Sequence, residues 1–228
     1  MPGKLVNFGE RKQSWVILAL DFPKYKDFLS ETYRLLEKLS NMLAGVKIGL
    51  PAFLRVGPEE IGELAQAFKG ELYFLADLKL ADIEDVTLEE IMLIESMGFD
   101  GAIIHLFPQC ISKPPRTDID LYGLVSMSCR ASLIDHHFQD LLDYAGSLRL
   151  TGVVVGATKP DMIKRARERL GEALILSPGI GFQGAAPGSA LKAGADFEIV
   201  GRSVVFSQDP LGELSRIVES QRVVKRGN

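Results

Sequence analysis

The sequence contains little cysteine and histidine, the residues that most often bind zinc or, for cysteine, cross-link chains, with two cysteines and three histidines in 228 residues. Cys110 and Cys129 form no metal-ligand spacing with His105, His136 and His137, so a zinc site is not expected. In the absence of an export signal, the two cysteines are expected to be reduced thiols of a cytoplasmic protein.

Long apolar runs and an excess of positive charge are also missing. The apolar run near the N-terminus, Trp15–Leu20, has six residues and is followed by Asp21, which is too short for a membrane span or a signal-peptide core. Lys plus Arg number 26 and Asp plus Glu 30, for a net charge of −4. Nucleic acids and anionic membranes are therefore not expected partners, and any bound anion must be held by a local cluster of donors.

The sequence has enough apolar residues, 46% of the chain, for a sizeable core. Most of the apolar runs show no alternation, which is typical of parallel strands buried on both faces. The predicted strands are Trp15–Leu20, Ala44–Ile48, Leu72–Ala76, Gly101–Ile104, Leu121–Ser126, Thr151–Val155, Ala173–Leu176 and Phe197–Val200.

Amphipathic segments between these runs predict helices over Phe28–Leu39, Pro58–Phe68, Leu88–Met97, Leu133–Tyr144, Asp161–Leu170 and Leu211–Val218. Residues 106–118 contain three prolines and are predicted to form a loop. No linker divides the chain. We therefore expect an α/β fold, a single (β/α)₈ TIM barrel over residues 1–228, with residues 1–13 and 223–228 frayed. A doubly wound open sheet is the alternative.

Polar residues gather just past the predicted strands, where barrel enzymes carry their catalytic groups. A lone charge at a strand end is usually only solvated, but three consecutive strands are followed or ended by Asp21, Lys47, Asp77 and Lys79. The period of a strand predicts that Asp77 and Lys79 share one face. Alternating charges of this kind can hold one lysine protonated as a proton donor and one carboxylate as an anion.

The segment Gly179–Gly184 matches the G-x-G-x-x-G pattern of dinucleotide-binding folds. It follows the seventh predicted strand and comes directly after Pro178, whereas the dinucleotide pattern opens the helix of an early βαβ unit. We therefore favour a phosphate site built from the loops after strands 7 and 8. Gly201, Arg202 and Ser203 would supply a backbone N–H, a guanidinium and a hydroxyl to the same phosphate.

With these residues the sequence resembles the orotidine 5′-monophosphate decarboxylase family in its short archaeal form. The matching motifs are Leu-Ala-Leu-Asp21, Val-Lys47-Ile-Gly, Asp77-x-Lys79-x-x-Asp82-Ile, Val-Val-Gly156-Ala-Thr, Ser177-Pro-Gly-Ile-Gly-x-Gln183-Gly and Ile-Val-Gly201-Arg202-Ser. The D-x-K-x-x-D element is shared with sugar-phosphate enzymes of the same superfamily. The Ser-Pro-Gly-Ile-Gly-x-Gln-Gly loop is more specific to the orotidylate enzymes.

The resemblance implies decarboxylation of orotidylate to UMP by a cytoplasmic homodimer without metal or cofactor. It implies that Lys79 protonates C6 of the pyrimidine and that Asp77 lies against the substrate carboxylate. Lys47 and Asp21 would bind the ribose and extend the charge network. Asp82 would cross the dimer interface to the ribose in the neighbouring subunit's site.

The resemblance also implies the remaining substrate contacts. Ser128 would bind the pyrimidine edge, and the 5′-phosphate would lie on Gln183, Arg202 and the N–H of Gly201. The loop from Pro178 to about residue 187 would close over it.

The sequence departs from the family at three positions. Val86 stands where threonine is common, so Thr87 is the nearest candidate for a ribose contact. Leu106 and Ala185 each replace a common glycine, which predicts a rebuilt loop after strand 4 and a stiffer loop after strand 7.

Three other functions use some of the same residues. A metal-assisted sugar-phosphate decarboxylase or synthase would use the D-x-K-x-x-D face for an enediolate. A non-catalytic nucleotide-binding homologue would not need Asp77, Lys79 and Asp82 intact. A Schiff-base aldolase would use Lys79 as its nucleophile.

Overall fold

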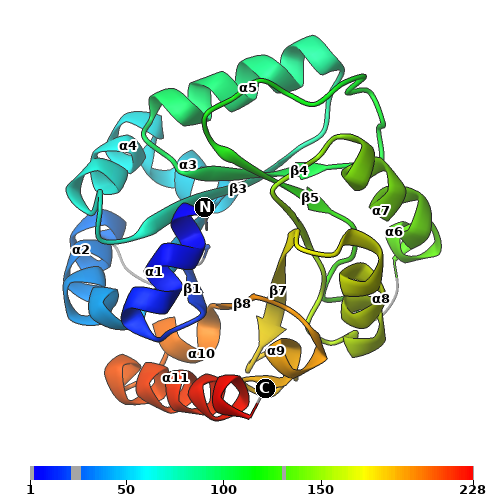
Figure 1. Cartoon of the computed structure of the whole chain (residues 1–228). Helices are drawn as coiled ribbons and strands as arrows, with labels where there is room; N and C mark the ends of the chain where they lie inside the picture. Colours follow the sequence, from blue (N-terminus) through cyan, green and yellow to red (C-terminus); the bar gives the residue numbers. More distant parts are fainter. Residues whose placement is uncertain (1–2, 22–26, 130–131, 228) are drawn as a thin grey trace.

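A computed structural model describes residues 3–21, 27–129 and 132–227. Within these residues eight parallel strands pair in sequence order, and β8 pairs with β1 to close a barrel (Figure 1). The strands are β1 (Val16–Ala19), β2 (Gly45–Gly49), β3 (Tyr73–Leu80), β4 (Gly101–His105), β5 (Asp120–Leu124), β6 (Gly152–Val154), β7 (Leu174–Ile180) and β8 (Phe197–Val200). The predicted (β/α)₈ barrel is confirmed, and the open-sheet alternative is wrong.

Helices surround the barrel, most of them in an outer ring (Figure 1). They are α1 (Lys4–Lys12), α2 (Phe28–Leu39), α3 (Leu50–Val56), α4 (Pro58–Ala67), α5 (Glu84–Ser96), α6 (Leu133–His136), α7 (Phe138–Ser147), α8 (Pro160–Leu170), α9 (Ser189–Ala193), α10 (Arg202–Val205) and α11 (Pro210–Arg226), with a 3₁₀ turn η1 (Ser40–Met42) after α2. Capping side chains fix the N-terminal ends of two of these helices. Asp27 accepts a hydrogen bond from the N–H of Ser30 at 3.1 Å and so caps α2. Asp209 caps α11 in the same way.

The core has two layers, because successive residues of each strand point to opposite faces. Side chains such as Ile17, Leu75 and Ile103 fill the inside of the barrel. Leu18 and Val46 belong to the larger layer between the strands and the helices. The predicted burial of the strands on both faces is confirmed.

Two strands extend beyond the apolar runs that predicted them. β3 continues to Leu80 and β7 to Ile180, so Asp77, Lys79 and Pro178 belong to the strands themselves. An apolar run underestimates such a strand because the backbone pairing continues where the side chains become polar at the mouth of the barrel.

The expected fraying of the chain ends is wrong for most of the residues concerned. Residues 4–12 form α1, which lies inside the ring of outer helices (Figure 1). Its Leu5 and Phe8 pack with the inner side chains of the barrel. The Nζ of Lys12 donates hydrogen bonds to the carbonyls of Ser40 and Leu43, both at 2.8 Å. At the other end, α11 continues to Arg226.

The other connections agree in part with the sequence: each predicted helical segment contains a helix, but α3, α9 and α10 were not predicted. Residues 106–119 contain no helix, as the prolines predict. The predicted helix Leu133–Tyr144 is divided at His137 into α6 and α7. Within the described ranges, no helix combines the length and the apolar character that crossing a membrane requires.

Candidate active site

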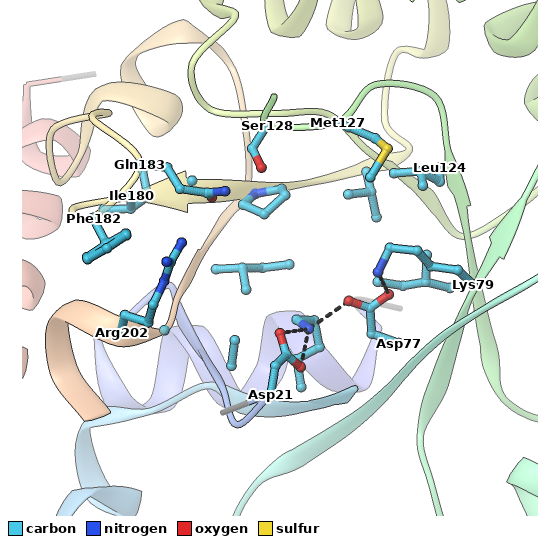
Figure 2. Close-up of a pocket in the computed structure, with 18 residues that line it drawn as sticks. Asp21, Asp77, Lys79, Leu124, Met127, Ser128, Ile180, Phe182, Gln183 and Arg202 are labelled. Atoms are coloured by element: carbon cyan, nitrogen blue, oxygen red, sulfur yellow. Dashed lines mark hydrogen bonds and ion pairs between the residues drawn. The ribbon is translucent and has the colours of Figure 1, made fainter. Parts of the chain in front are cut away.

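A row of alternating charges lies at the C-terminal mouth of the barrel (Figure 2). The Nζ of Lys47 donates hydrogen bonds to both carboxylate oxygens of Asp21, at 2.8 and 2.7 Å, and to Oδ2 of Asp77 at 2.6 Å. The Nζ of Lys79 donates to Oδ1 of Asp77 at 2.7 Å. Four charged side chains from the ends of β1, β2 and β3 therefore form one connected array.

The backbone of these strands brings the array together. Lys47 pairs in register with Ala19 of β1 and Leu75 of β3. Gly49 ends β2, and a Cβ at this position would clash with the carboxylate of Asp21. The glycine therefore leaves the room in which Asp21 reaches Lys47.

Strand β3 is irregular where it enters the site. Its register with β4 shifts between Ala76 and Leu80, and Lys79 has a φ of +52°. A positive φ is uncommon for a residue with a side chain, and strained backbone of this kind clusters at functional sites, where the surrounding structure holds it. Lys79 is thus aimed at the mouth by a bulge as well as by strand alternation.

Burial and charge act in opposite directions on the inner pair of the row. Burial favours the neutral form of Lys47, but the negative charges of Asp77 and Asp21 outweigh it and raise the pKa of this lysine. Burial likewise opposes the ionised form of Asp77, but Lys47 and Lys79 outweigh it and lower its pKa. Both side chains are therefore charged at neutral pH, although each is almost fully buried.

The opposite wall of the mouth is built from the segments after β7 and β8. Gly181 accepts a hydrogen bond from the N–H of Gly184 at 2.9 Å, which closes a tight turn with Phe182 and Gln183 at its centre. Arg202 begins α10 next to this turn, and its guanidinium carbon lies 3.5 Å from the centre of the Phe182 ring. This wall presents a cation and an amide to the space above the barrel.

Between the two walls lies a cavity of about 210 Å³ with an apolar floor (Figure 2). Side chains of the inner barrel layer, such as Ile103, Val154 and Ile199, form the floor. Met127 and Ser128 close it on the side of the loop after β5. The cavity can take a ligand with an anionic group at one end, an apolar ring face and a reacting centre at Lys79.

Most of the predicted site residues come together here. The cavity is lined by Asp21, Lys47, Asp77, Lys79, Ser128, Pro178, Gln183, Gly201 and Arg202. The glycine-rich segment Gly179–Gly184 lies beside Arg202 through its residue Phe182.

Asp82 and Thr87 do not line this cavity. The carboxylate of Asp82 is exposed and accepts a hydrogen bond from the N–H of Ile83 at 2.7 Å. Thr87 is only 2% exposed, and its hydroxyl donates to the backbone carbonyl of Asp82 at 3.3 Å. The expected substrate contact of Thr87 is therefore wrong for this geometry, because its side chain turns into the first turn of α5. Val86 is exposed but apolar.

The other two departures from the family pattern have clear local settings. Leu106 is fully buried and packs against Gly123 of β5. Ala185 accepts the N–H of Gly181 at 2.8 Å and donates to the carbonyl of Gly179 at 3.3 Å. It therefore closes the base of the turn that carries Phe182.

Comparisons with known proteins show the family of the chain. The family model described as "Orotidine 5'-phosphate decarboxylase / HUMPS family" matches residues 14–217. The chain belongs to this family.

Individual relatives match this chain over most of the length of both proteins. An orotidine 5'-phosphate decarboxylase of Aeropyrum pernix is 38% identical over 216 residues, which span 90% of this chain and 87% of the relative. The enzyme of the same name from Sulfurisphaera tokodaii is 33% identical, over 91% of this chain and 95% of the relative. The crystal structure of orotidine 5'-monophosphate decarboxylase from Metallosphaera sedula superimposes with a TM-score of 0.80 at 35% identity, over 92% and 99% of the two chains.

The sequence did not point to every residue in the cavity of this family member. Phe182 occupies the variable position of the Ser-Pro-Gly-Ile-Gly-x-Gln-Gly motif, and Met127 directly precedes Ser128. Neither phenylalanine nor methionine is a residue type that by itself indicates a catalytic or binding role. Their positions beside Gln183 and Ser128 were the available signal, because neighbours of a ligand-binding residue in a tight loop tend to face the same space.

Proposed function

We propose that the protein decarboxylates orotidine 5′-monophosphate to UMP, with Lys79 as the proton donor to C6 of the pyrimidine. The observation that carries this proposal is the ion-paired row from Asp21 to Lys79, which faces Arg202 across one cavity. Membership of the family and relatives of that printed name at 38% and 33% identity support it.

The proposed reaction is redox-neutral. The bond between C6 and the carboxylate carbon breaks, and its electron pair stays on C6 while carbon dioxide leaves. The ammonium of Lys79 gives one proton to this pair and so forms the C6–H bond. The amine then takes a proton from water, which restores the starting state.

Asp77 is proposed to lie against the substrate carboxylate. Two like charges about 4 Å apart repel by about 4 kcal/mol at an effective dielectric constant of about 20. Lys47 and Lys79 keep Asp77 ionised, as its lowered pKa indicates. The repulsion is relieved as carbon dioxide leaves, and the attraction between Lys79 and the growing negative charge on C6 increases. The array thus stabilises the transition state more than the bound substrate.

The rest of the nucleotide is assigned to the two walls of the cavity. The ribose lies on Lys47 and Asp21, and Ser128 contacts the pyrimidine edge. The 5′-phosphate lies on Gln183, Arg202 and the N–H of Gly201. In this arrangement the phosphate is far from the bond that breaks, so its binding energy can position the substrate and close the Pro178–Pro187 loop.

The proposal includes a homodimer in which Asp82 serves the partner's site. Asp82 is exposed and lies outside the cavity of its own chain, although it belongs to the D-x-K-x-x-D motif. The apolar side chains that follow it, Ile83 and Val86, are 60% and 40% exposed. An exposed carboxylate bordered by apolar side chains suits a surface that a second copy of the chain covers.

We further propose that residues 1–228 act as one barrel domain in the cytoplasm. The strands that close the barrel, β1 and β8, come from the two ends of the chain, which supports a single folding unit. Cys110 is an exposed free thiol, which suits a reducing compartment.

The deciding experiment is an assay of the purified protein with orotidine 5′-monophosphate, with and without EDTA. We expect loss of the orotidylate absorbance with stoichiometric UMP and carbon dioxide, at the same rate in both arms. An inactive protein that still binds UMP would support the non-catalytic alternative. Magnesium-dependent turnover of a sugar phosphate, with orotidylate unchanged, would instead support a sugar-phosphate decarboxylase or synthase. Trapping of a Schiff base on Lys79 by borohydride would support the aldolase.

A further inference from the structure

Phe182 makes an aromatic contact with Arg202 that the family motif does not specify. The guanidinium carbon of Arg202 lies 3.5 Å from the centre of the Phe182 ring, and both side chains line the cavity (Figure 2). An arginine above the face of an aromatic ring within about 6 Å is attracted by the ring quadrupole. At 3.5 Å the pair is in close stacking contact.

The turn that carries Phe182 is held close to α10 by its glycine. Gly181 has a φ of +74°, which favours glycine. A Cβ at Gly181 would lie 2.8 Å from Oγ of Ser203, so a larger residue would push the turn away from α10. The close approach places Phe182 over Arg202, the residue before Ser203.

The exposure of Phe182 indicates that core packing does not explain its position. The side chain is 65% exposed at the tip of a turn. A single exposed apolar residue needs no explanation by itself. Here, however, the ring stacks on the one cation assigned to the phosphate, and its chain neighbour Gln183 is the second side chain assigned to the same group.

We propose that Phe182 is a positioning residue that holds the guanidinium of Arg202 ready for the substrate's phosphate, an inference that rests on the proposed function. Stacking occupies the flat face of the guanidinium and leaves the N–H groups at its edge for hydrogen bonds to phosphate oxygens. It also restricts the rotamers of a long side chain before the ligand arrives, which lowers the entropy lost on binding. Because Phe182 and Gln183 share one turn, the contact fixes both phosphate ligands relative to each other.

Binding of UMP and of uridine to Phe182 variants, measured by calorimetry, tests the proposal. We expect Phe182→Ala and Phe182→Leu to weaken UMP binding about tenfold, and Phe182→Tyr to stay within about twofold of the original protein. Uridine lacks the phosphate, so its affinity should change less than about twofold. In orotidylate turnover, Phe182→Leu should raise KM about tenfold with little change in kcat. Because Phe182 is exposed, the variants are expected to fold, which circular dichroism checks.

A double-mutant cycle with Arg202→Ala identifies the partner of the ring. In the Arg202→Ala background, Phe182→Ala should weaken UMP binding by less than about twofold more. The proposal is overturned if Phe182→Leu binds UMP as the original protein does, if uridine is weakened as much as UMP, or if the Phe182→Ala effect is undiminished without Arg202. UMP binding requires no turnover, so a failure of the proposed decarboxylation and a failure of this inference are separate results.

Discussion

Lys79 and Asp77 are two positions apart in β3, and the Nζ of Lys79 donates a hydrogen bond to Oδ1 of Asp77 at 2.7 Å. In a regular strand these side chains would stand side by side along one face. Here the φ of +52° at Lys79 and the register shift before Leu80 turn the lysine within the mouth. The same carboxylate also accepts from Lys47 at 2.6 Å, so Asp77 joins two lysines.

Replacing Lys79 removes the proposed proton donor while leaving the rest of the cavity in place. We expect Lys79→Ala to lower kcat for orotidylate by at least about 1000-fold, because the proposed proton donor to C6 is lost and the neighbouring Lys47 is held between two carboxylates. UMP should still bind, since the phosphate contacts lie on the opposite wall. Loss of orotidylate absorbance gives kcat, and calorimetry gives the affinity for UMP.

An exposed lysine on α8 supplies the control for this variant. Lys164 pairs with Asp161 at 3.4 Å on the outside of the barrel, so Lys164→Ala should keep the original kcat. Normal turnover by Lys79→Ala would contradict the role of Lys79 as proton donor.

Asp77 also contributes to stability. Asp77→Asn leaves Lys47 buried with Asp21 as its remaining anion and should lower the free energy of unfolding by about 2–4 kcal/mol. Urea denaturation measures the loss. Asp143→Asn is the control, because its ion pair with Arg169 at 2.6 Å is half exposed and should cost less than about 1 kcal/mol.

The stability difference between the original protein and Asp77→Asn depends on pH through the pKa of Asp77. The folded pKa is lowered, so the unfolded chain takes up a proton first as the pH falls. The contribution of Asp77 is therefore complete above about pH 4, near the ordinary value of an aspartate, and is lost as the pH falls through the folded value. The stability gap between the original protein and Asp77→Asn should be constant from about pH 5 to 8 and should narrow below about pH 4. A gap that widens in acid would contradict this account of the ion pairs.

The strands could be predicted from the sequence because burial on both faces leaves long apolar runs. The charged row could be predicted because the barrel directs strand ends to one mouth. The bulge at Lys79 could not, since nothing in Asp77-Leu-Lys79 indicates a left-handed backbone. Strand alternation correctly predicted that Asp77 and Lys79 are neighbours, but it did not include the bulge that also orients Lys79.

Two other features needed the three-dimensional structure. Helix α1 was missed because its composition is polar, and only the folded barrel shows the open end that Leu5 and Phe8 cover. Thr87 was assigned to the substrate from its position beside Val86, but one residue along a helix turns a side chain by about 100°. That rotation takes its hydroxyl into the protein.

Arg202 should determine affinity for the phosphate without taking part in bond breaking. We expect Arg202→Ala to raise KM for orotidylate about 100-fold, because a charge-assisted contact to a dianion is lost. Arg165→Ala is a matched control: its guanidinium carbon also lies over a phenylalanine ring, that of Phe138 at 5.2 Å, but on the outside of the barrel. Steady-state kinetics over a range of substrate concentrations separates KM from kcat. An unchanged KM in Arg202→Ala would refute its phosphate role.

The shared-site proposal predicts recovery of activity when two inactive variants are mixed. Lys79→Ala and Asp82→Ala should each be nearly inactive as homodimers. After subunit exchange, a mixed dimer would contain one site with Lys79 from one chain and Asp82 from the other. Random exchange makes about half of the dimers mixed, with one intact site in each, so about a quarter of the original activity should return. If Asp82 acted in its own chain, no mixed dimer would contain a complete site, and proven exchange without recovery would exclude the shared site.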